Sequence, residues 1–297
     1  MTLLEVPHHF GKYGHHQGAT GFAKIIFSCN RTSRTAISRL NTQSPLLVQR
    51  ALYPDTSLPR MAHVYLMSSS GGILQGDRFE IEIEAEANTM ARITTQSATK
   101  IYKMDKGYAF QKININANDG SYVEFVPRQL IPFKSSRFCQ DVRISASTGS
   151  TVMYSETVSA GRIASGENFD FDACFLRMRV YDSESRLLFS DVCNIDPAQD
   201  RKETFERLFG GKSIWSTVYV VTPKGNHRSM DKEIEKGINN GPVLAGRSYL
   251  PNDCGLIVRM LDNSIDRIEE MISLVTKIVR SHAAKANMNQ QEGKEAP

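Results

Sequence analysis

The sequence predicts a mainly β fold of two packed, multi-stranded sheets, sandwich-like or solenoid-like, with one or two helices late in the chain. Short segments of alternating apolar and polar residues follow one another from about residue 21, separated by turn signals roughly 8–15 residues apart. A strong helical period appears only at 264–282. These intervals leave no room for crossover helices, so we expect mainly antiparallel pairing or a stacked, solenoid-like array.

Composition divides the chain into three parts. Residues 1–20 are rich in His, Gly and Gln, which predicts a flexible arm. Residues 21–282 carry the strand and helix patterns and predict a single mainly β domain. Residues 283–297 are polar and predict a disordered tail, because such a composition buries little apolar surface.

The clearest strand is Phe79–Ala85, where apolar residues at odd positions alternate with Glu at even positions. Successive side chains of a strand point to opposite faces of the sheet, so this segment is half-buried with one face in water. Turn signals such as Asn118-Asp119-Gly120 separate the other strands. We expect these at Thr89–Thr95, Gln111–Ala117, Ser121–Val126, Phe138–Ser145, Thr151–Ser155, Phe169–Tyr181, Arg186–Cys193 and Ile214–Val221.

Two helices are expected after residue 200. Arg201–Phe209 predicts a short helix that ends at Gly210-Gly211. Ser264–His282 predicts a longer one, because its apolar residues recur every three or four positions and form one face. Polar residues that can cap a helix precede this segment, and basic residues lie near its end, where they suit the helix dipole.

The overall composition excludes several classes of function. The chain has 297 residues, of which 40% are hydrophobic and 23% charged, and its formal net charge is +4. The basic residues are scattered, so we expect no nucleic acid partner. No apolar run approaches the roughly 18 residues of a membrane-spanning helix.

Cysteine usage and the N-terminus predict the compartment. The five cysteines form no CxxC pair, and their odd number suits reduced thiols. The N-terminus has no continuous apolar segment, which argues against a secretory signal. We therefore expect a cytoplasmic protein.

Two histidine pairs form the most metal-like feature of the sequence, namely His8 with His9 and His15 with His16. Neutral imidazole is a good ligand for Ni(II) and Zn(II), so a Gly-rich arm could wrap an ion weakly. The spacing matches no closed metal site, and flexible ligands lose entropy when they bind. A solvated arm is the alternative interpretation.

Acidic residues offer a second kind of chemistry. Gly71–Asp77 resembles a phosphate loop only superficially, because Asp77 stands where the Walker motif needs lysine. Asp77 either has a functional role or bonds backbone amides in a tight turn. Glu156 and Glu167 flank Gly161-Arg162 and could act as the paired carboxylates of a hydrolase. The alternative is that these carboxylates form ion pairs with Lys100 or Arg162.

Four segments, in their order along the chain, resemble motifs of the UreD (UreH) family of urease accessory proteins. They are Gly71–Asp77, Thr94–Lys100, Phe125–Phe133 and Gly161–Phe169. The resemblance implies two packed sheets with few helices. It also implies a non-enzymatic scaffold that docks on apo-urease and recruits a helical accessory protein and a nickel-carrying GTPase.

The resemblance further implies that nickel passes through an internal polar channel, so that Ni(II) is transient and no cofactor is tightly bound. By motif match, the polar residues of this path are Asp77, Ser97, Lys100, Glu156 and Glu167. Isolated oxygen ligands hold an ion weakly enough to release it, whereas a tetrahedral Cys/His site would trap it. The alternative function is a hydrolase on a β scaffold that uses paired carboxylates.

Overall fold

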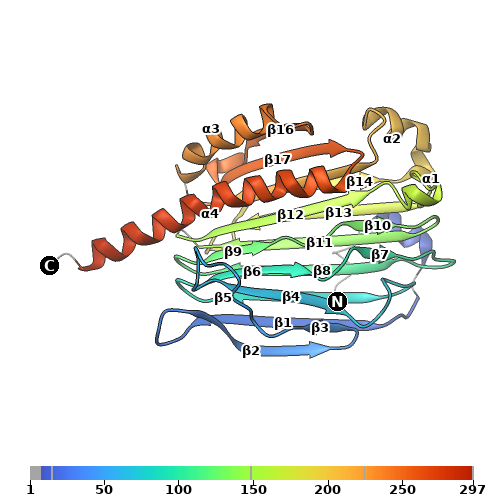
Figure 1. Cartoon of the computed structure of the whole chain (residues 1–297). Coiled ribbons are helices and arrows are strands. Elements are labelled where there is room, and N and C mark those ends of the chain that lie inside the picture. Colours follow the sequence, from blue (N-terminus) through green and yellow to red (C-terminus); the bar gives the residue numbers. More distant parts are fainter. Residues whose placement is uncertain (1–7, 15, 148, 224, 296–297) are drawn as a thin grey trace.

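The structure is a computed structural model that describes the backbone of residues 8–14, 16–147, 149–223 and 225–295. Side chains are described within these ranges from residue 10 to residue 283. The side chains of His8, His9 and His15 and most of the predicted tail therefore lie outside the described residues. The strands form two sheets, and the helices lie on one sheet and at one end (Figure 1).

The first sheet, sheet A, has seven strands in the order β14-β13-β11-β8-β5-β1-β2. Their bounds are β1 Thr20–Cys29, β2 Thr35–Gln43, β5 Arg78–Ala85, β8 Ala109–Ala117, β11 Arg137–Ala146, β13 Ala173–Tyr181 and β14 Leu187–Ile195. In β5 the odd-numbered residues are buried and the glutamates are partly exposed, as the alternation predicts.

The second sheet, sheet B, has ten strands, eight of them in the order β16-β17-β15-β12-β9-β6-β4-β3, with β10 beside β12 and β7. Their bounds are β3 Leu46–Val48, β4 Ala62–Ser68, β6 Met90–Thr95, β7 Thr99–Ile101, β9 Tyr122–Phe125, β10 Leu130–Pro132, β12 Thr151–Ser159, β15 Ile214–Val221, β16 Leu244–Tyr249 and β17 Gly255–Asp262.

The chain alternates between the sheets from β4 to β13, apart from the short β7 and β10. Neighbours within a sheet are therefore parallel, as in β5–β8, β8–β11 and β9–β12. The strand in the opposite sheet supplies the crossover that a helix supplies elsewhere. This confirms the predicted solenoid-like arrangement, whereas the mainly antiparallel alternative is wrong for these central strands. Antiparallel pairs occur towards the edges, as in β1–β2 and β13–β14.

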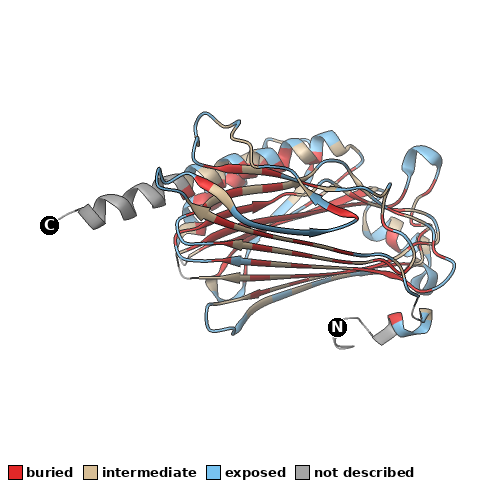
Figure 2. Cartoon of the chain, turned by 90° about the horizontal axis from the view of Figure 1, so that it is seen from below, coloured by how far each residue is buried: buried red, intermediate tan, exposed pale blue. Residues whose placement is uncertain are grey.

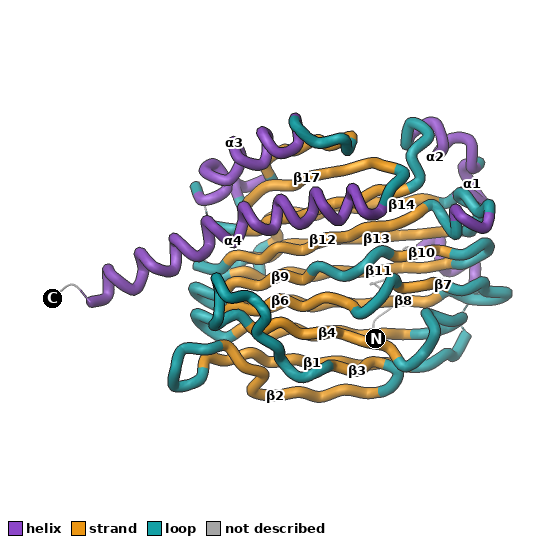
Figure 3. The backbone as a smooth tube through the Cα atoms, viewed as in Figure 1, coloured by secondary structure: helices purple, strands orange, loops and turns teal. Residues whose placement is uncertain are grey.

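Four α-helices occur in the described chain, namely α1 Pro197–Asp200, α2 Lys202–Leu208, α3 Asn226–Asn239 and α4 Ile265–Glu295. The segments predicted as helices correspond to α2 and α4, whereas α3 was not predicted. Helices α3 and α4 pack on sheet B, and α1 and α2 lie at the end of the sheets near β7 and β10 (Figure 3).

Three hydrophobic clusters hold these layers together. The largest fills the space between the sheets, where the buried positions of the strands face one another (Figure 2). The second lies between sheet B and helices α3 and α4, and includes Ile268, Val275 and Val279 of the predicted helical face. The third surrounds Phe10, which belongs to the 3-10 helix η2 (His8–Tyr13) and is fully buried.

Candidate functional site

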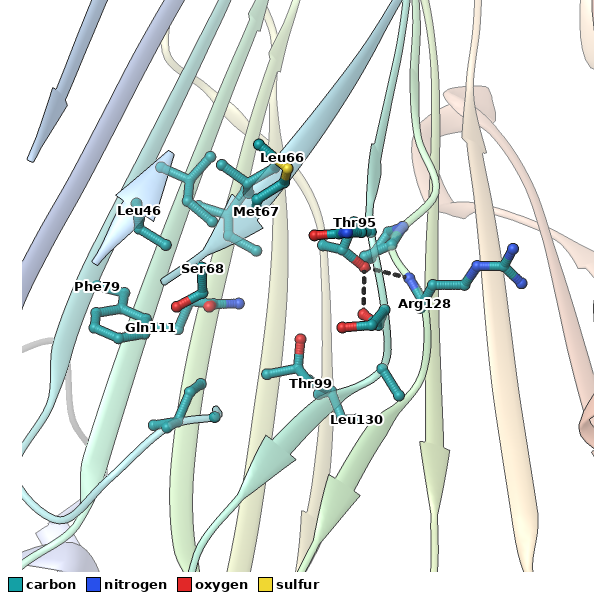
Figure 4. A pocket seen from close by; sticks show the side chains of 18 of the residues that line it. Leu46, Leu66, Met67, Ser68, Phe79, Thr95, Thr99, Gln111, Arg128 and Leu130 are labelled. Carbon is teal, nitrogen blue, oxygen red and sulfur yellow. Dashed lines mark hydrogen bonds between the residues drawn. The ribbon is translucent and has the colours of Figure 1, made fainter. Parts of the chain in front are cut away.

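A cavity of about 100 Å³ opens between the two sheets, and much of its lining comes from the predicted motif segments (Figure 4). The first three motifs contribute respectively residues 71–73, residues 95–99, and four residues from Phe125 to Leu130. A Cβ atom on Gly72 would lie 2.5 Å from the carbonyl oxygen of Lys100, so only glycine lets the first two motifs pack this closely. Sequence motifs that are far apart therefore meet around one cavity.

The inner wall of the cavity combines apolar and polar side chains. Its polar residues include Gln111 on β8, Gln140 on β11, and Tyr154 and Glu156 on β12. Their apolar neighbours on these strands, such as Ile113 and Val152, belong to the cluster between the sheets. An inward-facing position is normally apolar, so four polar side chains here are a specific departure from the pattern of a core.

Glu156 is the buried acid of this wall, with 8% of its surface exposed. Its Oε2 atom accepts hydrogen bonds from Gln140 Nε2 at 2.8 Å and from the Tyr154 hydroxyl at 3.2 Å. Burial raises the pKa of Glu156 to about 7, although these two hydrogen bonds lower it. The group therefore changes charge near neutral pH and has no positively charged partner among the described side chains.

Side-chain contacts continue away from Glu156 in both directions, through a hydrogen bond on one side and through stacked rings on the other. On one side, Gln111 Nε2 donates to Gln140 Oε1 at 2.9 Å. On the other side, the Tyr154 ring stacks on that of Tyr219, with centroids 6.0 Å apart. The Tyr219 hydroxyl donates to Asp191 Oδ2 at 2.9 Å.

Asp191 also accepts a hydrogen bond from Arg259 at 2.5 Å. The Arg259 side chain is 61% exposed, so this pair lies at the protein surface. Polar and aromatic side chains therefore extend from the cavity to the surface residues Asp191 on β14 and Arg259 on β17.

The structure places the predicted path residues unequally. Ser97 and Glu156 line the cavity, with Ser97 on the exposed loop at its mouth and Glu156 on its inner wall. Lys100 is exposed on β7, and its side chain is not part of the lining. Asp77 and Glu167 are also outside the lining.

Asp77 is buried in the turn before β5. Its Oδ2 accepts a hydrogen bond from the backbone N–H of Leu74 at 2.8 Å, and its Oδ1 accepts one from that of Ala19 at 2.9 Å. Asp77 therefore ties the N-terminal segment to this turn, which is the backbone-bonding arrangement that the sequence left open.

Glu167 forms a two-pronged ion pair with Arg162, in which Arg162 Nε lies 2.9 Å from Glu167 Oε2 and Nη2 contacts Oε1. The hydrogen bond from Arg162 lowers the pKa of Glu167 and outweighs the effect of burial. Because Glu156 lies in the cavity and Glu167 lies outside its lining, the two glutamates do not share this site. The hydrolase alternative required Glu156 and Glu167 as paired carboxylates in one site, and the structure does not place them together.

A second buried carboxylate lies on the strand next to β12. Glu124 on β9 is fully buried and is bound by Arg92, with Nη1 2.6 Å from Oε2, and by Arg280 of α4, with Nη2 2.8 Å from Oε2. Burial alone would raise the pKa of Glu124, but the hydrogen bond from Arg280 and the charge of Arg92 lower it. Arg280 also contacts Asp55 at 3.0 Å, so this cluster attaches α4 to sheet B.

No group of three or more His, Cys, Asp or Glu side chains within the described residues could hold a metal ion. Of the four N-terminal histidines, only His16 has a described side chain, and it is exposed. In the same described part of the chain, no helix is long and apolar enough to cross a membrane.

Sequence reasoning missed Gln111, Gln140, Tyr154, Asp191 and Tyr219. The available signal was a polar residue at an inward position of a strand, as in Thr151–Ser159, where Tyr154 and Glu156 share one face with Val152 and Val158. That signal can be used only when it is known which face of each strand points towards the opposite sheet.

Two stacked, solenoid-like sheets enclose a cavity that carries buried polar side chains, which defines the class as a mainly β protein with an internal cavity. A family model described as UreD urease accessory protein matches residues 19–292. The chain therefore belongs to the UreD family of urease accessory proteins, which confirms the resemblance seen in the motifs.

Individual relatives agree with this assignment. "Urease accessory protein UreD" of Cenarchaeum symbiosum is 39% identical over 241 residues, which cover 81% of this chain and 84% of the relative. "Urease accessory protein UreD 2" of Brucella canis is 32% identical over 274 residues, covering 91% and 90%. The protein of that name from Streptomyces griseus is 32% identical over 261 residues, covering 88% and 89%.

Proposed function

We propose that the protein is a non-catalytic maturation factor that docks on apo-urease, recruits a helical accessory protein and an accessory GTPase, and helps to deliver nickel to the urease active site. Membership of the UreD family supports the urease role. The proposal places this work in the cytoplasm, with no nucleic acid or membrane partner.

The single observation that supports nickel passage is the environment of Glu156. This carboxylate lies in a cavity between the sheets and is bonded only to neutral donors. A buried anion without a cationic partner gains most from a mobile cation, because Coulomb attraction is strong in a medium of low polarity. Oxygen ligands with interspersed water also suit an ion that must be released.

The path in this proposal begins at the mouth near Ser97, passes Glu156 and continues towards Asp191. Asp77, Lys100 and Glu167 are expected to act in the same maturation role through the loops around the mouth, rather than as ligands inside the cavity. The ion is cargo in this scheme, so no tightly bound cofactor is expected.

The proposal is tested by deleting the gene and measuring urease activity and the nickel content of urease. Co-purification with urease subunits, the helical accessory protein and the GTPase tests the scaffold role. We expect low urease nickel in the deletion strain and a stable complex with the partners. Normal urease nickel without this protein would contradict the proposal.

A further inference from the structure

We propose that Gln140 is a positioning residue that turns the carbonyl oxygen of Gln111 into the cavity, so that a divalent cation meets two protein oxygens, Gln111 Oε1 and Glu156 Oε1. This inference rests on the proposed function and names a site within it. The ligand class is a hydrated divalent cation that accepts oxygen donors, such as Ni(II).

The first step is the contact between Gln140 and Glu156. An ionised carboxylate only accepts hydrogen bonds, so Gln140 must present its NH₂ group to Glu156 Oε2, as observed at 2.8 Å. The Tyr154 hydroxyl donates to the same oxygen and accepts from Gln140 Nε2 at 3.0 Å. Both neutral donors are therefore used on Oε2, and Oε1 receives no hydrogen bond from the described side chains.

The second step is the transfer of this orientation to Gln111. Once the NH₂ group of Gln140 faces Glu156, its Oε1 atom must face the other way. Gln111 lies directly opposite Gln140 in the β8–β11 register and donates its Nε2 to that Oε1 at 2.9 Å. The orientation of one amide thus determines that of the next.

The remaining polar atom of the Gln111 amide is its carbonyl oxygen, Oε1. With its Nε2 atom used, Gln111 is left with Oε1, which accepts no hydrogen bond from any described residue, and Gln111 lines the cavity. A free carbonyl oxygen attracts a cation, whereas a free NH₂ group would repel it. Without Gln140, Gln111 could present either group to the cavity. The two linked amides of Gln140 and Gln111 form an orientation relay, and this relay selects the carbonyl oxygen, which suits a cation.

Two oxygens bind a cation weakly, which suits passage rather than storage. Ni(II) would keep most of its water ligands at such a point, and the protein would replace few of them. Groups that orient a metal ligand typically change metal affinity by about 10- to 100-fold when they are removed. Gln140 is expected to act in this way on Gln111.

The test uses the full-length protein with His8, His9, His15 and His16 changed to Ala, so that imidazoles near the N-terminus do not contribute. Ni(II) binding is measured by equilibrium dialysis, and folding is checked by thermal melting. Gln140→Leu is expected to lower the Ni(II) affinity about tenfold. Asn116→Ala, at an exposed position of β8, is the matched control and should leave the affinity unchanged.

The deciding variant combines Gln140→Leu with Gln111→Glu. A carboxylate at 111 presents oxygen in either orientation, so it no longer needs Gln140, and the double variant should regain the affinity of the parent. A loss in Gln140→Leu that Gln111→Glu does not restore would overturn the relay, because it would show that Gln140 acts only on the fold.

A further variant avoids any disturbance of the Gln140–Glu156 contact. Gln111→Leu removes the proposed ligand and should also lower the affinity about tenfold, while an unchanged affinity would overturn the proposal. The proposed function is tested separately by the nickel content of urease matured with Glu156→Gln. If that variant delivers less nickel while Gln140→Leu and Gln111→Leu bind Ni(II) normally, the relay fails and the nickel path does not.

Discussion

Glu124 and Glu156 lie on adjacent parallel strands, β9 and β12, and both are almost completely removed from water. Glu124 is held by two arginines, and its pKa is lowered despite burial. Glu156 is held by an amide and a phenol, and burial raises its pKa to about 7. The choice of partner, rather than the depth of burial, decides what each carboxylate can do.

An arginine partner satisfies a buried carboxylate permanently and makes it part of the architecture. Neutral donors orient a carboxylate but supply no compensating positive charge. Glu124 is therefore committed to attaching α4 to sheet B. Glu156, when ionised, has only neutral donors around it and can therefore attract a cation. It lies in the cavity from which a cation could reach it.

The largest expected effect is the loss of an arginine from Glu124. Arg280→Met leaves the buried carboxylate with one arginine, Arg92, and the Tyr122 hydroxyl, and should reduce the free energy of unfolding by about 3–5 kcal/mol. The matched control is Arg128→Met, since Arg128 also pairs with a residue of α4, Glu269, but both side chains are largely exposed. Denaturant unfolding should show a cost below about 1 kcal/mol for the control. Equal costs for the two variants would contradict the structural role of the Glu124 cluster.

An intermediate effect is expected for Glu156→Gln, with a dependence on pH. The folded-state pKa of Glu156 is raised from 4.5 to about 7, so ionising it opposes folding. The wild-type free energy of unfolding should therefore fall relative to the variant as pH rises from about 4.5 to 7, and remain lower above pH 7. The raised pKa corresponds to a difference of about 3 kcal/mol. Unfolding curves of both proteins from pH 5 to pH 8 measure it, and parallel pH profiles would show that Glu156 is not buried as described.

The smallest effect is expected from nickel itself. The purified protein should bind Ni(II) weakly and exchangeably, because the described residues contain no cluster of metal-ligating side chains. At a nickel concentration equal to the dissociation constant, binding adds only about 0.4 kcal/mol to stability. Thermal melting with and without Ni(II) tests this. A tight, stoichiometric site that survives removal of residues 1–20 would refute the weak-binding prediction.

The sequence predicted the parts of the fold that depend on local periodicity. The alternation in β5 and the repeated apolar residues of α4 identify their elements without knowledge of their neighbours. Helix α3 was missed because Met230, Ile234 and Ile238 are its main apolar residues among many polar ones. The parallel pairing was left open because the pattern of a strand does not show which sheet it joins.

The candidate site was only partly predictable for a related reason. Glu156 was selected through a motif, but its burial depends on the opposite sheet. Gln140 has no local signal, since a single polar residue in a strand also occurs on exposed faces. Asp77 and Glu167 were selected by the same motif argument, and the structure places them in a turn and an ion pair outside the cavity lining.

The most direct test of the account is the nickel content of urease matured with Glu156→Gln. The variant removes the charge and keeps the shape, so the complex with urease and the other accessory proteins should assemble as with wild type. Nickel per urease active site is then measured in complexes of equal composition. The account predicts clearly less nickel with Glu156→Gln than with wild type. Equal nickel content in a stable, fully assembled complex would contradict it.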